Sequence, residues 1–319
     1  MRLGVLVSFV LFCLLQIGSS PLSAERLPIA ATRDGARSLH NFRDLAERCA
    51  DWAAKLEPIQ KKMGKIRAGD WLAYHKEPGQ TFAQYLEERP RSARGVRNVI
   101  YLQPIGEFSK GQQRLLDDTV KFIRAFFIVP VKVLDTVPTN AIPSRARRRH
   151  PSWGDSQMLT TYILHELLLP RLPRDGAAIL ALTTSDLWAG AGWNFVFGQA
   201  SLRSRVGVWS IYRNGSPDEG EKKYRLALLR TIKTAAHETA HMLSLRHCRT
   251  YECLMNGSNS RSESDRRPLA CCSHCLAKLW WATGSEPQIR FKRLVKFCKD
   301  VGLRKQEKRY QELLDKLSK

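Results

Sequence analysis

Two histidines with a glutamate between them are the residues of this chain whose spacing is best suited to chemistry. His237 and His241 are four residues apart, and Glu238 follows the first of them. On an α-helix this spacing puts both imidazoles on one face, so that they can share a metal ion while the carboxylate reaches its bound water. The pattern HExxH predicts a zinc hydrolase. The alternative is a pair of core histidines satisfied by hydrogen bonds.

A third histidine follows at a distance that suits a catalytic metal site. A zinc ion that does chemistry keeps three protein ligands and an open position for water. His247 can be the third ligand if the chain turns sharply after His241. The expected reaction is attack of a zinc-activated water on a peptide carbonyl, with Glu238 taking the proton and returning it to the leaving amine.

Four further cysteines are spaced like the ligands of a second, closed zinc site. They form two short-range pairs, Cys248 with Cys253 and Cys272 with Cys275. Four thiolates leave no position for water, so this zinc would be structural. Disulfides are the alternative if the protein is exported to an oxidising compartment. Three other cysteines remain: Cys49, Cys271 and Cys298. They would form either one disulfide and a free thiol, or three buried thiols.

The combined motif resembles one known family. The chain resembles the archaemetzincins, which are zinc metallopeptidases of the metzincin type, in its pattern HExxHxxxxxHCxxxxCxM followed by CxxC. Other stretches share this resemblance, which covers residues 67–298: DWLAYHKEPGQTFAQYL, YLQPIG, SDLWAGAGWNFVFGQASL, LRHC, CLMNGSN and DRRPL. Several of these are too specific to arise from composition.

The resemblance implies roles for individual residues and two zinc ions. The catalytic zinc would be held by His237, His241 and His247, with Glu238 as general base. Met255 would be the methionine of the Met-turn beneath this site. The structural zinc would be held by the four paired cysteines, Cys248, Cys253, Cys272 and Cys275.

The resemblance also implies the fold and the activity. We expect an α/β metzincin-type domain with a twisted mixed sheet, an active-site zinc helix and a small C-terminal four-cysteine subdomain. The family suggests aminopeptidase-like action on short peptides. Endopeptidase action stays open, because no acidic residue is identified that would hold the amino terminus of a substrate.

One residue departs from the family pattern. The family has glycine three residues after the second histidine, and this chain has Ser244. If that position needs a positive φ, serine costs on the order of 1 kcal/mol. The placement of His247 depends on this turn, so the departure bears directly on activity. A four-cysteine zinc beside His247 would brace the turn.

The chain is long enough for one large domain or two small ones, and four segments are expected. Residues 1–24 contain one basic residue, a short apolar run and small residues, which is typical of a secretory signal peptide. An uncleaved membrane anchor is the alternative. The other segments are an N-terminal helical segment (25–66), the archaemetzincin-like catalytic domain (67–298) and a charged, solvated C-terminal tail (299–319).

Periodicity predicts the elements around the zinc helix. Residues 98–106 and 129–135 are expected to be parallel strands joined by a helix over 115–127. The arginine-containing stretch 135–157 is expected to be a solvated loop. The family resemblance implies that a strand before the zinc helix forms the upper edge of the cleft, where it would bind an extended peptide through residues Asn194, Phe195, Val196, Phe197 and Gly198. An ordinary core strand is the alternative.

The chain is strongly basic. It has 52 Lys and Arg against 30 Asp and Glu, a formal net charge of +22. Such a charge favours acidic surfaces or substrates, but the basic residues are dispersed, so we expect no specific nucleic-acid partner. We expect a monomer that acts on a peptide or protein substrate. The alternatives are a non-catalytic zinc protein of the same fold that binds peptide or polyanion, and a four-cysteine nucleic-acid module, which leaves HExxH unexplained.

Overall fold

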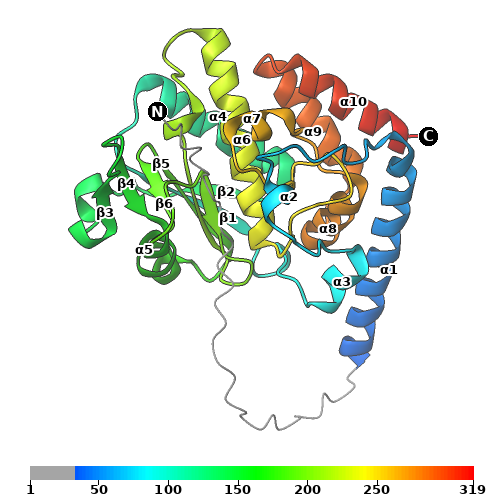
Figure 1. Cartoon of the computed structure of the whole chain (residues 1–319). Helices are drawn as coiled ribbons and strands as arrows, with labels where there is room; N and C mark the ends of the chain where they lie inside the picture. The colour runs from blue at the N-terminus through cyan, green and yellow to red at the C-terminus, as the bar shows by residue number, and fades with distance from the viewer. Residues whose placement is uncertain (1–32) are drawn as a thin grey trace.

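The computed structural model describes residues 33–319, which form a mixed α/β fold (Figure 1). Its centre is a five-stranded sheet in the order β2-β1-β5-β8-β7. β7 runs antiparallel to β8 at one edge, and the other neighbours are parallel. The expected mixed sheet is confirmed. Its strands are β1 (Val99–Ile105), β2 (Val131–Val133), β5 (Gly176–Thr183), β7 (Gly198–Ala200) and β8 (Val206–Ser210).

The central strands are buried on both faces, as their apolar sequences require. Alternate residues of β1 enter two different cores: Ile100 lies in the core beneath α4 (Lys110–Phe127) and α6 (Glu221–Met242), whereas Tyr101 lies in a second core on the opposite face. The predicted strand, helix, strand unit is β1, α4 and β2. The sequence pattern predicts the zinc helix over about residues 223–243, and α6 begins and ends within two residues of these bounds.

The first described helix packs with the C-terminal helices at one side of the sheet (Figure 1). α1 (Arg33–Leu56) packs against α8 (Ser273–Thr283), where Trp52 meets Trp280 edge-on at 5.6 Å between ring centroids. α1 ends shortly before Pro58, a residue that cannot continue an α-helix. α9 (Pro287–Asp300) and α10 (Arg304–Leu317) complete this helical layer.

The C-terminal tail differs from the prediction. α9 crosses the expected boundary at residue 298, and α10 buries Tyr310, Leu313 and Leu317 against the helical layer. Residues 299–319 are highly charged, but they also contain apolar residues at helical spacing. These apolar residues give α10 a buried face. The segment is part of the folded domain rather than a solvated tail.

The arginine-containing stretch also differs from the prediction. Arg147–Arg149 form the edge strand β3 of a second sheet, with β4 (Ser156–Leu159) in the middle and β6 (Asp186–Trp188) beyond it. Arg148 is half-buried, donates hydrogen bonds to the carbonyls of Trp193 and Asn194, and lies over the ring of Trp188. Three residues of the expected loop therefore form a strand. The contacts of Arg148 that hold this strand cannot be predicted from a run of charged residues.

The remaining elements are short: α2 (Trp71–Tyr74), α3 (Phe82–Glu87), α5 (Thr160–Tyr162), a π-helical turn (Ile163–Leu168) and α7 (Arg261–Arg266).

The predicted leader, residues 1–24, lies outside the described residues. Across residues 33–319, no helix is long and apolar enough to cross a membrane. The predicted signal peptide and secretion therefore gain no support from the described residues.

Candidate metal centre and active site

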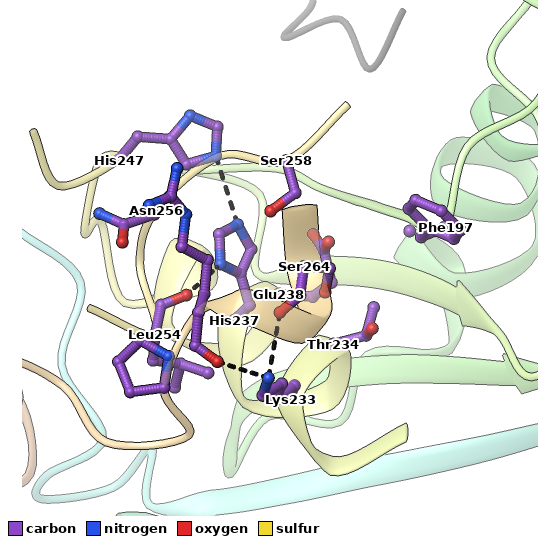
Figure 2. Close-up of a pocket in the computed structure, with 13 residues that line it drawn as sticks. Phe197, Lys233, Thr234, His237, Glu238, His247, Leu254, Asn256, Ser258 and Ser264 are labelled. Carbon is purple, nitrogen blue, oxygen red and sulfur yellow. Dashed lines mark hydrogen bonds between the residues drawn. The ribbon is translucent and has the colours of Figure 1, made fainter. Parts of the chain in front are cut away.

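Helix α6 and the turn after it bring the three predicted histidines together. Nε2 of His241 lies 2.9 Å from Nε2 of His237, which lies 3.3 Å from Nε2 of His247. Figure 2 shows the rings of His247 and His237 pointing toward each other in the wall of the pocket. Three ring nitrogens of the same type therefore point at one small volume, and all three candidate ligand atoms lie within 4.8 Å of one another.

The other nitrogen of each ring is fixed by an acceptor. Nδ1 of His237 lies 2.9 Å from the carbonyl of Leu254, and Nδ1 of His241 lies 2.6 Å from the carbonyl of Leu245. An Nδ1–H donated to a carbonyl leaves Nε2 with a free lone pair directed at the shared volume. Burial lowers the pKa of His237 to about 3 and that of His241 well below its usual value, which keeps both imidazoles neutral, the form that binds metal.

Glu77 orients the third histidine, and sequence reasoning missed it. Its two carboxylate oxygens lie 3.0 and 2.9 Å from Nδ1 of His247. Burial raises the pKa of Glu77, but the hydrogen bond and charge of His247, with smaller contributions from Trp71 and His75, together outweigh burial, and the net shift is downward. A carboxylate, histidine, metal arrangement fixes the tautomer of the ring and increases its basicity. The available signal was the stretch DWLAYHKEPGQ, which contributed to the family resemblance without a residue-level role.

Trp71 and Gly257 pack around this third histidine. Trp71 meets His247 edge-on at 5.2 Å and stacks on His75 at 3.7 Å between ring centroids. A Cβ placed on Gly257 would lie 2.4 Å from Cδ1 of Trp71, so this glycine is required by close approach. Its position in CLMNGSN is thus explained by packing against the tryptophan.

The turn that delivers His247 has the strained conformation expected at Ser244. Ser244 has φ +68°, and the amides of Ser244 and Leu245 donate to the carbonyls of His241 and Ala240 at 2.8 and 3.1 Å. These two bonds are those of a Schellman helix end, which glycine usually occupies. Here the serine hydroxyl accepts from the amide of Arg91 at 3.0 Å and donates to the carbonyl of Leu202 at 3.1 Å.

Glu238 lies in the same pocket and is almost fully buried. Burial raises the pKa of Glu238 to about 8. A Cβ on Gly198 would lie 2.8 Å from Oε1 of Glu238, so the start of β7 passes directly over this carboxylate. The hollow itself is small, with a volume of about 70 Å³, and Figure 2 shows Phe197 on the side opposite His237.

The five predicted substrate residues are divided by the structure. Phe197 and Gly198 line the pocket. Val196 is a core residue with 1% exposure, and its amide donates to the carbonyl of Leu187. The strand begins only at Gly198, so the expected edge strand over 194–198 is mostly irregular chain.

Asn194 and Phe195 have structural contacts away from the pocket. The carbonyl of Asn194 accepts from Gln157 at 2.8 Å, and Arg213 lies 3.8 Å from the centroid of Phe195. Apolar alternation suggested one continuous strand here, but these side chains pack against the second sheet and its loops.

The four paired cysteines also converge. Their sulfurs lie within 4.8 Å of one another, and all four residues are buried. The sulfur of Cys253 accepts from the amides of Cys272 and Met255 at 3.2 and 3.4 Å, as thiolate ligands commonly do. Hydrogen bonds from Cys253 and Cys272 lower the pKa of Cys248, whereas burial raises that of Cys253. A divalent cation is the group that allows four buried thiolates to coexist.

No disulfide joins the cysteines of the described chain, where all seven are free and buried. Cys49 and Cys298 have their pKa raised to about 12 by burial, so they are inert core thiols. Of the two arrangements left open for the remaining cysteines, the structure has three buried thiols.

Met255 connects the two clusters. It is fully buried, and its carbonyl accepts from the amide of Cys248 at 2.7 Å. The carbonyl of Leu254 accepts from His237, and the carbonyl of Met255 accepts from Cys248, the residue after His247. The segment 253–255 therefore contacts both candidate metal sites.

Comparison with known proteins finds similar sequences and structures. Residues 174–280 match Peptidase family M54. Archaemetzincin-2 of Rattus norvegicus is 36% identical, with 72% of each chain covered. Archaemetzincin-1 of Homo sapiens is 33% identical over 74% of this chain and 53% of its own length. The crystal structure of archaemetzincin from Archaeoglobus fulgidus, complexed with malonate, aligns with a TM-score of 0.46 and 30% identity, covering 56% of this chain and 99% of that one.

The histidine cluster, the buried glutamate and the match to a peptidase family place the chain among the zinc metallopeptidases. The donor sets that it presents, three imidazoles and four thiols, fit zinc. The chain belongs to the archaemetzincin family, as its motifs indicated.

Proposed function

We propose that this zinc metallopeptidase hydrolyses peptide bonds with Glu238 as its general base, and that it holds one catalytic and one structural zinc ion. The observation that carries the proposal is the convergence of three imidazole Nε2 atoms in a pocket that also contains Glu238. Zinc bound by these histidines would polarise a substrate carbonyl and lower the pKa of a water molecule.

Glu238 has the environment that its role requires. It is one residue from His237, and it lies almost fully buried in the same pocket. A carboxylate placed there can take a proton from water during attack and return it to the leaving amine. The cysteine cluster, in contrast, is closed by its four sulfurs and supports the turn that carries His247.

The edge strand β7 is proposed to bind the substrate backbone. It is the last strand of its sheet, with β8 as its one neighbour, and its first residue lies over Glu238. An extended peptide added to such an edge would place its scissile carbonyl beside the histidines. Phe197, immediately before the strand, would contact a side chain of that peptide.

The end of the peptide that is recognised can be tested separately. Glu238 is the one carboxylate among the described residues lining the pocket, whereas Lys233 and Arg267 are cations. An aminopeptidase must bind a free amino group, usually with an acidic residue. Peptides with free and with acetylated amino termini will therefore distinguish the two activities. The aminopeptidase-like action suggested by the family requires the free amine, whereas internal cleavage does not.

Glu238→Gln tests the mechanism, with the exposed Glu219→Gln as matched control. The first variant should lose turnover by about 100-fold or more and keep its zinc, because general base catalysis contributes on that order and Glu238 is not a ligand. The control should behave like the parent. Unchanged cleavage by Glu238→Gln would refute the role of this residue. A parent protein that binds zinc and peptide without cleaving it would favour the non-catalytic alternative.

A further inference from the structure

Two adjoining hollows on the surface are lined by arginine. Their volumes are about 750 and 280 Å³, and Arg91 contributes to both. No lysine lines either hollow, and the one carboxylate, Glu88, pairs with Arg246 at 3.1 Å. We call them the arginine hollows. Their eight arginines are Arg89, Arg91, Arg94, Arg97, Arg174, Arg203, Arg205 and Arg246.

No carboxylate lines the larger hollow, and two of its arginines have no partner within the described chain. Across residues 33–319, the side chains of Arg97 and Arg174 have no hydrogen bond or ion pair, and both residues are exposed. Burial lowers the pKa of Arg205, and the charges of Arg97 and Arg91 lower it further. Like charges are held close together here, an arrangement that an anion would relieve.

The backbone around the hollows is strained. Among the described residues, four that are not glycine have a positive φ, and three of them line the hollows: Arg89 at +50°, Arg205 at +61° and Ser244 at +68°. Each such conformation costs on the order of 1 kcal/mol or more, and strained residues cluster where a ligand is bound. The strain and the uncompensated charge are independent observations at the same place.

A third hollow shows that the overall charge of the chain does not account for this arrangement. It lies between α4 and α9, has a volume of about 650 Å³, and combines its basic residues with Asp117, Asp118 and Asp300. Lys121 pairs with Asp118 at 2.8 Å, and Lys296 pairs with Asp300 at 2.8 Å. A hollow of similar size on the same basic protein thus contains carboxylates that pair with some of its basic residues.

We propose that the arginine hollows bind a small organic polyphosphate, either free or as the headgroup of a phosphorylated lipid. The planar guanidinium group offers two parallel N–H donors that match the oxygens of a phosphate, whereas lysine acts as a point charge. Exclusive use of arginine therefore favours phosphate. Several guanidinium groups around one hollow favour a ligand with more than one phosphate. This site is separate from the zinc pocket and does not depend on the proposed peptidase activity.

Inositol hexakisphosphate is the soluble probe, measured by isothermal titration calorimetry on the zinc-loaded protein. The test variant is Arg97→Gln with Arg174→Gln. The matched control is Arg293→Gln with Lys296→Gln at the third hollow, which removes the same charge. The test variant should bind the probe at least about tenfold more weakly, since it loses two charge-assisted contacts, and the control should change less than about twofold. Unchanged zinc content will establish that each variant is folded.

Vesicles of phosphatidylcholine, with and without a bisphosphorylated phosphoinositide, identify the source of the phosphates. Retention on the phosphoinositide vesicles that is lost in the test variant assigns a lipid headgroup. Binding of the soluble probe without vesicle retention assigns a free polyphosphate. Equal weakening in the test and control variants would mean that only net charge matters and would overturn the proposal. So would absence of binding to the probe and to both kinds of vesicle.

Discussion

Ser244 offers a direct test of how this chain tolerates a departure from its family at the turn that carries the third histidine. Its φ of +68° costs a residue with a Cβ about 1 kcal/mol relative to glycine. Its hydroxyl makes two hydrogen bonds, to the amide of Arg91 and the carbonyl of Leu202. Each contributes about 1 kcal/mol net, so the bonds more than offset the strain.

Two substitutions separate these effects. Ser244→Gly removes the strain and both hydrogen bonds, which gives a net loss of about 1 kcal/mol in the free energy of unfolding. Ser244→Ala keeps the strain and loses the bonds, which gives a loss of about 2 kcal/mol. The expected order of stability is parent, then Gly, then Ala.

Denaturant unfolding of the zinc-loaded proteins measures this order, with Ser216→Ala at an exposed serine as control. The Ser244→Ala protein should also lose zinc to a chelator more readily, because the turn positions His247. A glycine variant more stable than the parent would refute the reasoning, since the hydroxyl bonds would then contribute too little to offset the strain.

Three further substitutions test the surroundings of the two metal sites. Glu77→Gln should weaken zinc binding at the histidine site by about 10- to 100-fold in chelator competition, because an amide replaces the carboxylate that accepts from His247; an unaltered affinity would exclude this orienting role. Gly257→Ala should lower the free energy of unfolding by about 1–3 kcal/mol, since its Cβ would lie 2.4 Å from Trp71, whereas Gly64→Ala, with nothing within 4 Å, should not; equal effects would contradict the packing argument. Cys275→Ser should remove one equivalent of zinc and destabilise the protein, and Cys298→Ser, at a buried thiol outside the cluster, should retain the full zinc content. Full zinc content in Cys275→Ser would count against a four-cysteine site.

The parts of the site that could be predicted are those encoded by local spacing. His237 and His241 lie one helical turn apart, and the predicted cysteine pairs are close in sequence, so their convergence follows from the pattern itself. The sheet could be predicted in part for the same reason: β1 and β5 are apolar runs of strand length. Sequence reasoning failed where distant contacts decide the structure, as in the arginines that became β3.

The same distinction explains why Glu77 was missed. It lies 170 residues from His247 in the sequence, and nothing in its local pattern distinguishes it from a surface carboxylate. Its partner could be found only once the fold was known. Asn194 and Val196 were wrongly placed in a cleft strand for the same reason. Their alternation is that of a strand, but in the structure they contact the second sheet.

The position of His247 depends on several segments that are distant in sequence. Gln80 donates to the carbonyl of Ser244 at 3.2 Å and accepts from the amide of Arg246 at 3.2 Å, and Tyr85 donates to the carbonyl of Leu243 at 2.9 Å. Cys248, on the other side of the histidine, is tied into the sulfur cluster. The third ligand is thus held from both sides, and the helix end is one support among several. This arrangement explains how a turn that usually takes glycine can contain serine and still bring His247 to the other two histidines.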